Sequence, residues 1–177
     1  MGNFKSTTPV ILVGIGSNLA AAAYLSPHET AEAALAQLPA IDVRVVRRSR
    51  WYLSQPVPPS DQPWYVNGVV AVATGLDPLA LLDALLALEA RFGRRRSTRD
   101  AARTLDLDLL DCDGRELMSE RLTLPHPRLH ERRFVLAPLA EIAPGWRHPT
   151  LALSAGELLR RLPPGQEVRL FGDPLRP

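Results

Sequence analysis

The chain has 177 residues, of which 46% are hydrophobic and 23% charged, and its formal net charge is +2 at pH 7. This length suits one domain with its own core, so we expect a single domain over residues 1–177. The chain contains no apolar run long enough to span a membrane, and its single cysteine excludes a fold held by internal disulfides, so we expect a cytoplasmic protein without membrane association.

The first half of the chain predicts four elements in the order strand, helix, strand, strand. Residues 9–19 form a compact apolar run ending in Gly-x-Gly-Ser-Asn, which indicates a buried strand that stops in a tight turn. Residues 27–38 begin with proline and acidic residues and continue with alanine and leucine, as helices do. Residues 42–54 alternate and residues 65–74 are rich in valine, so both are predicted strands, with a proline-rich loop between them.

The second half adds a helix and a strand. Leucines recur along one face of residues 77–92, where Asp77 is the expected N-cap and Gly93 is expected to end the helix. A basic loop then leads into a predicted strand over residues 103–111, in which leucine and aspartate alternate.

The remainder is rich in turns, apart from two short helices predicted at 132–144 and 153–162. The order strand, helix, strand, strand, helix, strand is the βαββαβ arrangement of α+β ferredoxin-like domains. We therefore expect an antiparallel sheet with helices packed on it.

The alternation within residues 103–111 places Asp106 and Asp108 on the same face of the predicted strand, with their Cα atoms roughly 6–7 Å apart. Two carboxylates this close could approach one divalent cation or a pair of them. Without a metal they would repel, and one of them would have a raised pKa. The alternation alone is equally consistent with two aspartates that simply lie on the solvent-exposed face of a half-buried strand.

Arginines gather immediately before these two aspartates, at positions 94, 95, 96, 99 and 103. The planar guanidinium group suits polyphosphate oxygens, and hard oxygen ligands suit Mg²⁺, so a magnesium-bound nucleotide would satisfy both sets of side chains. Surface ion pairs between the arginines and the aspartates are the other explanation.

Two further features are open to more than one reading. Tyr65 and Asn67 share a face of their strand, where an amide beside a stacking surface could recognise the edge of a flat heterocycle, although core packing would also account for Tyr65. His126 and His130 are close in sequence but do not form a compact metal-ligand pattern, so a zinc site is not favoured.

Five segments, taken in order, resemble one family, the 6-hydroxymethyl-7,8-dihydropterin pyrophosphokinases. They are GIGSNL, DQPWYVNGV, LEARFGRRR, RTLDLDLL and LTLPHPRLHERRFVLAPLAEIAP, and the resemblance is strongest over residues 10–149. It implies a ferredoxin-like core and transfer of pyrophosphate from ATP to the hydroxymethyl group of the reduced pterin, giving AMP and the pterin diphosphate in folate biosynthesis. It also implies two Mg²⁺ ions, and we expect a monomer.

The resemblance implies a role for each matching residue. The metal ligands are Asp106 and Asp108, which act in catalysis together with Arg94 and Arg103. The implied ATP-binding residues are Glu89, Arg96, Arg103, Leu109, Arg121, Thr123, His126 and Arg132. The implied pterin-binding residues are Ser54, Val57, Tyr65, Asn67, Asp106 and Phe134, with Phe134 stacking on the ring.

Two other functions remain open from the sequence. Ferredoxin-like sheets can bind RNA, and an arginine-rich loop attracts phosphates, but the predicted central strands lack the exposed stacking aromatics of such sheets, so we expect no nucleic-acid partner. A different Mg²⁺-dependent nucleotidyl transferase could also use Asp-x-Asp, and it would release pyrophosphate rather than AMP.

Overall fold

The structure of the protein is a computed structural model that describes residues 11–94 and 101–173. The strands are β1 (Ile11–Ser17), β2 (Arg44–Arg48), β3 (Tyr52–Ser54), β4 (Tyr65–Ala73), β5 (Asp106–Cys112), β6 (Leu117–Met118), β7 (Thr123–Leu124) and β8 (Val168–Leu170). The α-helices are α1 (Pro27–Gln37), α2 (Pro78–Arg91), α3 (Arg133–Ile142) and α4 (Ala155–Arg161), and two 3-10 helices are η1 (Leu38–Ile41) and η2 (Leu129–Glu131).

The main sheet has the strand order that a βαββαβ chain gives. β1 lies between β5 and β4, β4 pairs along its length with both β2 and β3, and β8 adds to the outer side of β3. All of these pairings are antiparallel. The predicted α+β, ferredoxin-like fold is therefore confirmed.

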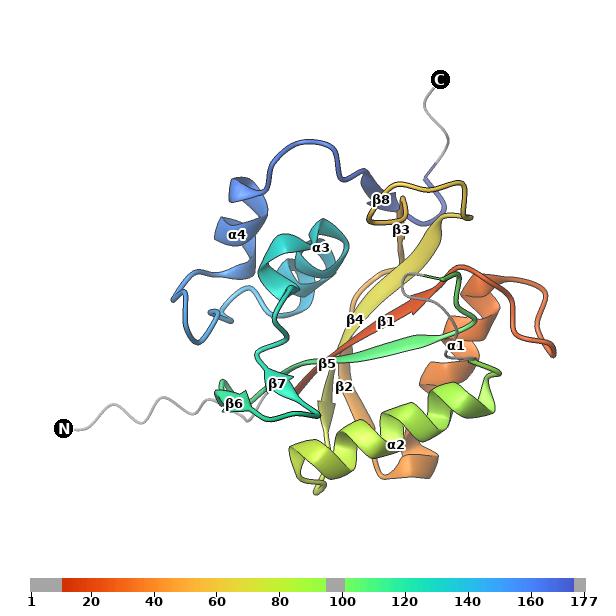
Figure 1. The fold of residues 1–177 in the computed structure, drawn as a ribbon, viewed down its shortest axis with the longest axis horizontal. Coiled ribbons are helices and arrows are strands. Elements are labelled where there is room, and N and C mark those ends of the chain that lie inside the picture. Colours follow the sequence, from red (N-terminus) through yellow and green to blue (C-terminus); the bar gives the residue numbers. More distant parts are fainter. Residues whose placement is uncertain (1–10, 95–100, 174–177) are drawn as a thin grey trace.

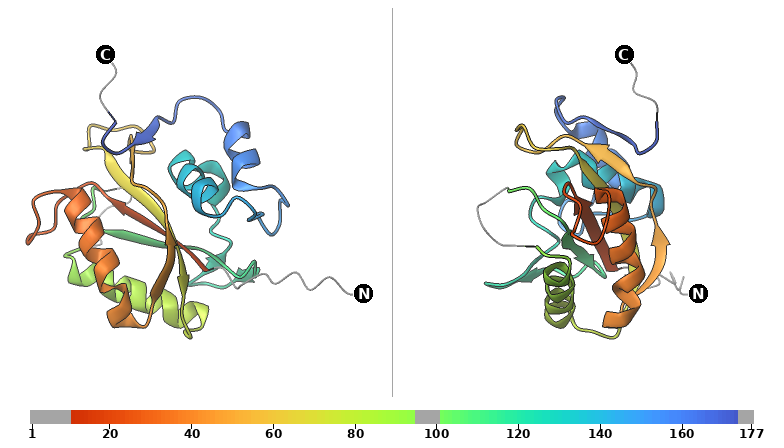
Figure 2. Two further views of the ribbon diagram at one scale, coloured as in Figure 1. Left: turned by 180° about the vertical axis from the view of Figure 1, so that it is seen from behind. Right: turned by 90° about the vertical axis from the view of Figure 1, so that its right-hand side faces the viewer.

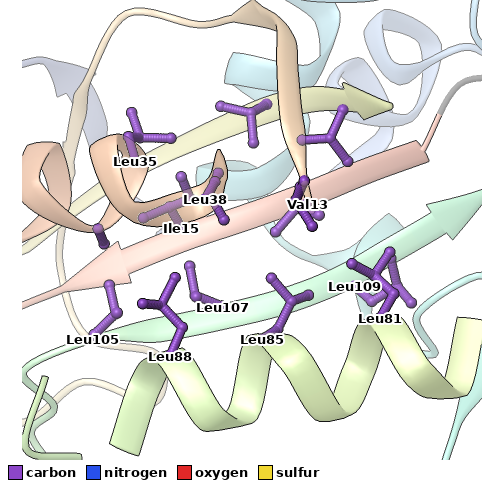
Figure 3. Close-up of a cluster of buried hydrophobic side chains, with 14 of the residues drawn as sticks. Val13, Ile15, Leu35, Leu38, Leu81, Leu85, Leu88, Leu105, Leu107 and Leu109 are labelled. Carbon is purple, nitrogen blue, oxygen red and sulfur yellow. The ribbon is translucent and has the colours of Figure 1, made fainter. Parts of the chain in front are cut away.

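Side-chain alternation along the strands divides the core between the two faces of the sheet. Figure 3 shows one face, where the leucines at odd positions in and just before β5 face the leucines of α2, while Leu35 of α1 and Leu38 of η1 lie near Ile15 of β1. The other face presents Leu12, Val69 and Leu110 to α3 and α4. Helices thus lie on both faces of the sheet (Figures 1 and 2).

The helix ends follow from local chemistry. Asp77 caps α2, because its Oδ1 accepts hydrogen bonds from the backbone N–H groups of Leu79 and Ala80, both at 3.0 Å. Gly93 follows the helix with a φ of 78°, a left-handed conformation that favours glycine. Both predicted boundaries are confirmed, and they fix where the arginine-containing loop begins.

The single strand predicted over residues 42–54 is wrong, because it is divided into β2 and β3. Ser49 interrupts it: its backbone N–H donates to Val69 O, while its hydroxyl accepts from the N–H of Val69, both at 3.0 Å. Beyond it, the ring of Trp51 packs so closely over Gly68 that a Cβ there would lie 2.8 Å from the ring. The Ser49 hydroxyl thus takes the place of a backbone carbonyl as the acceptor for the Val69 N–H, and regular strand pairing resumes at Tyr52.

The tight turn predicted at the glycines of GIGSN is also wrong. Gly14 and Gly16 both lie inside β1, paired with Asp108 and Asp106 of β5, and Gly16 also pairs with Asn67 of β4. A Cβ on Gly16 would lie 3.4 Å from the Asn67 Oδ1. These glycines leave the sheet bare of side chains between the aspartates and Asn67.

Two pairings were not predicted: the β6–β7 hairpin and the addition of β8 to β3. These strands are two or three residues long, too short to produce a readable alternation. Among the described residues, no helix has the length and apolar character needed to cross a membrane.

Candidate active site

Two hollows open on neighbouring parts of the sheet. The central cavity is walled by β1, β4, β5, the loop after β3 and the start of α3, and its lining includes Gly16, Ser54, Val57, Tyr65, Asn67, Arg103, Asp106, Asp108, Arg132 and Phe134. The edge groove runs along the outer side of β5, and its lining includes Glu89, Arg94, Asp108, Leu109, Arg121, Thr123 and His126. Asp108 lines both hollows, so they meet at this carboxylate.

Asp106 lines the central cavity, with 17% of its side chain exposed. Its Oδ1 is 2.7 Å from the Arg94 Nη1, and its Oδ2 is 2.5 Å from the Arg103 Nη1. Burial raises the pKa of Asp106, the negative charge of Asp108 raises it further, and the two arginines partly offset these effects. The repulsion expected from the sequence is therefore present.

Asp108 is the more accessible of the two carboxylates, with 34% of its side chain exposed. Its Oδ2 lies 3.2 Å from the Arg132 Nη1. Each aspartate thus has an arginine partner, and the shared face predicted for them is confirmed, since Leu105, Leu107 and Leu109 are buried on the opposite face.

Glu89 lines the edge groove but is a buried residue, with 2% of its surface exposed. Its Oε1 accepts a hydrogen bond from the backbone N–H of Leu107 at 2.6 Å and forms an ion pair with Arg94. Glu89 therefore satisfies an edge N–H of β5 and holds the arginine that reaches Asp106. Burial raises its pKa to about 7, although the Leu107 N–H and Arg94 act in the opposite direction.

The raised pKa of Glu89 predicts a pH-dependent stability in the metal-free protein. Between pH 4.5 and 7 the folded chain keeps a proton on Glu89 that the unfolded chain has lost, so the free energy of unfolding falls as the pH rises through this window. We expect a contribution on the order of 3 kcal/mol that Glu89→Gln lacks. Urea unfolding of both proteins from pH 4 to 8 checks this, and parallel curves would contradict it.

The residues implied in pterin binding lie together in the central cavity. Asn67 is almost fully buried, and its Nδ2 donates to the Ser54 Oγ at 2.9 Å and to the Tyr65 carbonyl at 3.3 Å. Phe134 lies across the cavity, with the Arg132 guanidinium 5.5 Å from its ring centroid. Val57 is half exposed in the loop after β3. An amide and an aromatic ring therefore line the same recess.

The residues implied in ATP binding divide between the two hollows. Arg121, Thr123 and His126 line the edge groove, whereas Arg103 and Arg132 line the central cavity. Arg121 is exposed and pairs with Asp83, and burial lowers the pKa of His126. The Leu109 side chain is buried in the core, which leaves its main chain to face the groove. Arg96 lies outside the described residues.

Asn18 supports the site from behind and was not singled out from the sequence. Asn18 is 1% exposed, and its Oδ1 accepts from the N–H of Arg103 at 2.7 Å. Its Nδ2 lies 3.2 Å from both the Gln62 Oε1 and the Pro63 carbonyl. Asn18 therefore ties the arginine beside Asp106 to the loop that borders the cavity. Its partners lie 44 to 85 residues away in sequence, so no local pattern could indicate them.

Comparison with known proteins gives a consistent result. A sequence model described as 7,8-dihydro-6-hydroxymethylpterin-pyrophosphokinase (HPPK) matches residues 12–144. A curated Pseudomonas aeruginosa protein named 2-amino-4-hydroxy-6-hydroxymethyldihydropteridine pyrophosphokinase is 44% identical over 163 residues, which cover 86% of this chain and 96% of that protein. A Synechocystis protein of the same name is 42% identical over 151 residues, covering 85% of this chain and 75% of that protein.

A solved structure supports the fold independently. The Plasmodium falciparum HPPK-DHPS triple mutant crystallised with SDX-DHP superposes with a TM-score of 0.65 at 14% identity, covering 90% of this chain. This chain spans only 45% of the length of that one. With the sequence match over most of its length, the chain belongs to the 7,8-dihydro-6-hydroxymethylpterin-pyrophosphokinase family.

Proposed function

We propose that the chain transfers pyrophosphate from ATP to the hydroxymethyl oxygen of 6-hydroxymethyl-7,8-dihydropterin, giving AMP and the pterin diphosphate in folate biosynthesis. The observation that carries this proposal is the meeting of the two hollows at Asp108. The central cavity offers an amide and an aromatic ring to a flat heterocycle, and the edge groove offers cationic side chains to a nucleotide. The phosphate chain would then lie at the aspartates, within reach of both substrates.

The donor set fits Mg²⁺ as the metal that the family resemblance implies. The described residues contain no group of three or more His, Cys, Asp or Glu side chains able to hold a metal by themselves. Mg²⁺ in nucleotide sites commonly takes one or two carboxylates and completes its shell with phosphate oxygens and water. The Asp106 Oδ1 is buried and makes no hydrogen bond, and its partner is the Arg94 guanidinium at 2.7 Å, so a metal could bind there by taking the place of that cation.

We propose that Asp106 and Asp108 would hold two Mg²⁺ ions together with the ATP phosphates. Bound magnesium would supply positive charge against the phosphate oxygens. The arginines would supply further positive charge. Arg94 and Arg103 pair with Asp106 in this structure, and they would turn to the phosphates if a metal took their place at the carboxylate. Pyrophosphoryl transfer depends mainly on alignment and charge neutralisation, which these side chains provide.

The test is to mix the purified chain, ATP, Mg²⁺ and the reduced hydroxymethyl pterin and to quantify the products. Equal amounts of AMP and pterin diphosphate are expected, and chelation of Mg²⁺ is expected to stop their formation. Release of pyrophosphate would point instead to a nucleotidyl transferase. No product, together with RNA retention that falls steeply with salt, would favour a nucleic-acid-binding module. Gel filtration of the same sample tests the monomer expected from the sequence.

A further inference from the structure

The C-terminal part of the chain reaches back to both walls of the central cavity. Gln166, Glu167 and β8, which we call the C-terminal strap (Gln166–Leu170), lie beyond residue 144, where the family match ends. Figure 1 shows β8 beside β3 and next to the loop that follows it. Within this strap, Val168 pairs with Ser54, one of the cavity residues.

The contact on the α3 side is made by one glutamine side chain. The Gln166 Oε1 accepts a hydrogen bond from the backbone N–H of Arg133, and the Gln166 Nε2 donates to the carbonyl of Glu131, both at 2.8 Å. The two peptide groups that it holds lie on either side of Arg132. A single amide thus clamps the backbone of this residue from both sides.

Arg132 needs such a clamp because it joins two helices. It ends η2 and begins α3 in an extended conformation, with φ −112° and ψ 107°, and its own side chain makes no capping hydrogen bond. The first N–H groups of a helix have no partner within the helix, so an acceptor must come from elsewhere. Gln166 supplies it from 33 residues away.

The clamped residue and the one two positions later both line the central cavity. The Arg132 guanidinium lies 3.2 Å from Asp108, and Phe134 faces the same recess. Since the direction of a side chain follows from the dihedral angles of its backbone, the clamp sets how Arg132 and Phe134 enter the cavity. On the opposite wall, Glu167 contacts Gln55 through both main-chain and side-chain atoms, at 3.4 and 3.3 Å.

We infer that Gln166 is a positioning residue for pterin binding, which acts by fixing the backbone at Arg132 and thereby the placement of Arg132 and Phe134 in the cavity. This inference rests on the proposed function, in which the central cavity takes the pterin. The loss of two neutral hydrogen bonds that hold a binding wall should weaken pterin affinity about five-fold.

The experiment compares Gln166→Ala with Gln37→Ala, which also removes a glutamine hydrogen bond, here to Arg91, at the end of α1 and away from both hollows. The readout is the Kd of 6-hydroxymethylpterin, from its fluorescence, with Mg²⁺ and an ATP analogue carrying a methylene group between the α and β phosphorus atoms. A Kd raised about five-fold in Gln166→Ala and unchanged in Gln37→Ala is expected. A purely structural role would lower the melting temperature and the active fraction without changing the Kd.

Gln166→Glu keeps the acceptor for Arg133 but turns a carboxylate oxygen toward the Glu131 carbonyl, which repels it, so its Kd should be raised about five-fold or more. This variant also serves if Gln166→Ala does not fold. An unchanged Kd in the folded variants would overturn the inference. AMP formation by the unmodified chain is measured in parallel, so that its failure, which would overturn the proposed function, is distinguished from failure of the positioning role alone.

Discussion

Asp108→Ala is expected to lower turnover by about 10²- to 10³-fold while the chain stays folded. The carboxylate lies where the central cavity meets the edge groove, so in the proposed mechanism it holds the metal-bound phosphates between the two substrates. Its removal also takes away the charge that helps raise the pKa of Asp106, so folding should not suffer. Steady-state AMP formation at saturating Mg²⁺, with circular dichroism, checks both parts.

Two further variants separate charge from volume at this position. Asp108→Asn keeps the shape of the side chain and removes its charge, so its turnover should fall nearly as far as that of Asp108→Ala. Asp173→Ala, which removes an exposed carboxylate near the end of the described chain, should leave turnover unchanged. If Asp108→Asn retained most of the activity, charge at this position could not carry the role proposed for it.

Arg103→Ala is expected to lower kcat by about 10²-fold with a smaller change in the KM for ATP. The Arg103 Nη1 lies 2.5 Å from the Asp106 Oδ2 and borders the central cavity, so it stands beside the place where charge would develop during transfer. An interaction made mainly in the transition state affects kcat more than substrate binding. Steady-state kinetics with ATP and the pterin varied in turn distinguish the two effects.

Arg103→Lys serves as the graded variant, since it keeps the charge and loses the planar fork, and it should recover only part of the lost rate. Arg115→Ala, at an exposed position after β5, controls for the loss of a surface cation. If Arg103→Ala instead raised the KM for ATP about 10²-fold and left kcat unchanged, Arg103 would bind the ground state and the transition state equally. It would then not act in the transfer step.

The part of the fold that could be predicted from sequence is the part with a clear periodicity. The leucines of α2, the cap at Asp77 and the alternation of leucine and aspartate in β5 are local patterns, and each produced the expected element. The division of residues 42–54 could not be predicted, because it depends on a hydrogen bond between Ser49 and Val69, 20 residues away. Tertiary contacts of this kind override local propensity.

The candidate site shows the same limit. Asp106 and Asp108 were predicted on one face because strand geometry alone places them there. Asn18 and Gln166 were not, because an asparagine or a glutamine in a turn-rich segment has no distinctive pattern until its distant partners are known. The placement of Arg132 in the central cavity also depends on how α3 packs across the sheet, which the sequence does not specify.

The glycines of β1 have a consequence for which molecules the cavity can accept. Between Asp106 and Asn67 the recess is bounded by main chain, and ladder hydrogen bonds hold that main chain from both neighbouring strands. Such a wall has no rotamers to adjust, so the depth available to a flat ring is constant. A bulkier ligand, whether a natural analogue or a synthetic inhibitor, would fit only if side chains at the rim of the cavity moved, where Val57 is half exposed.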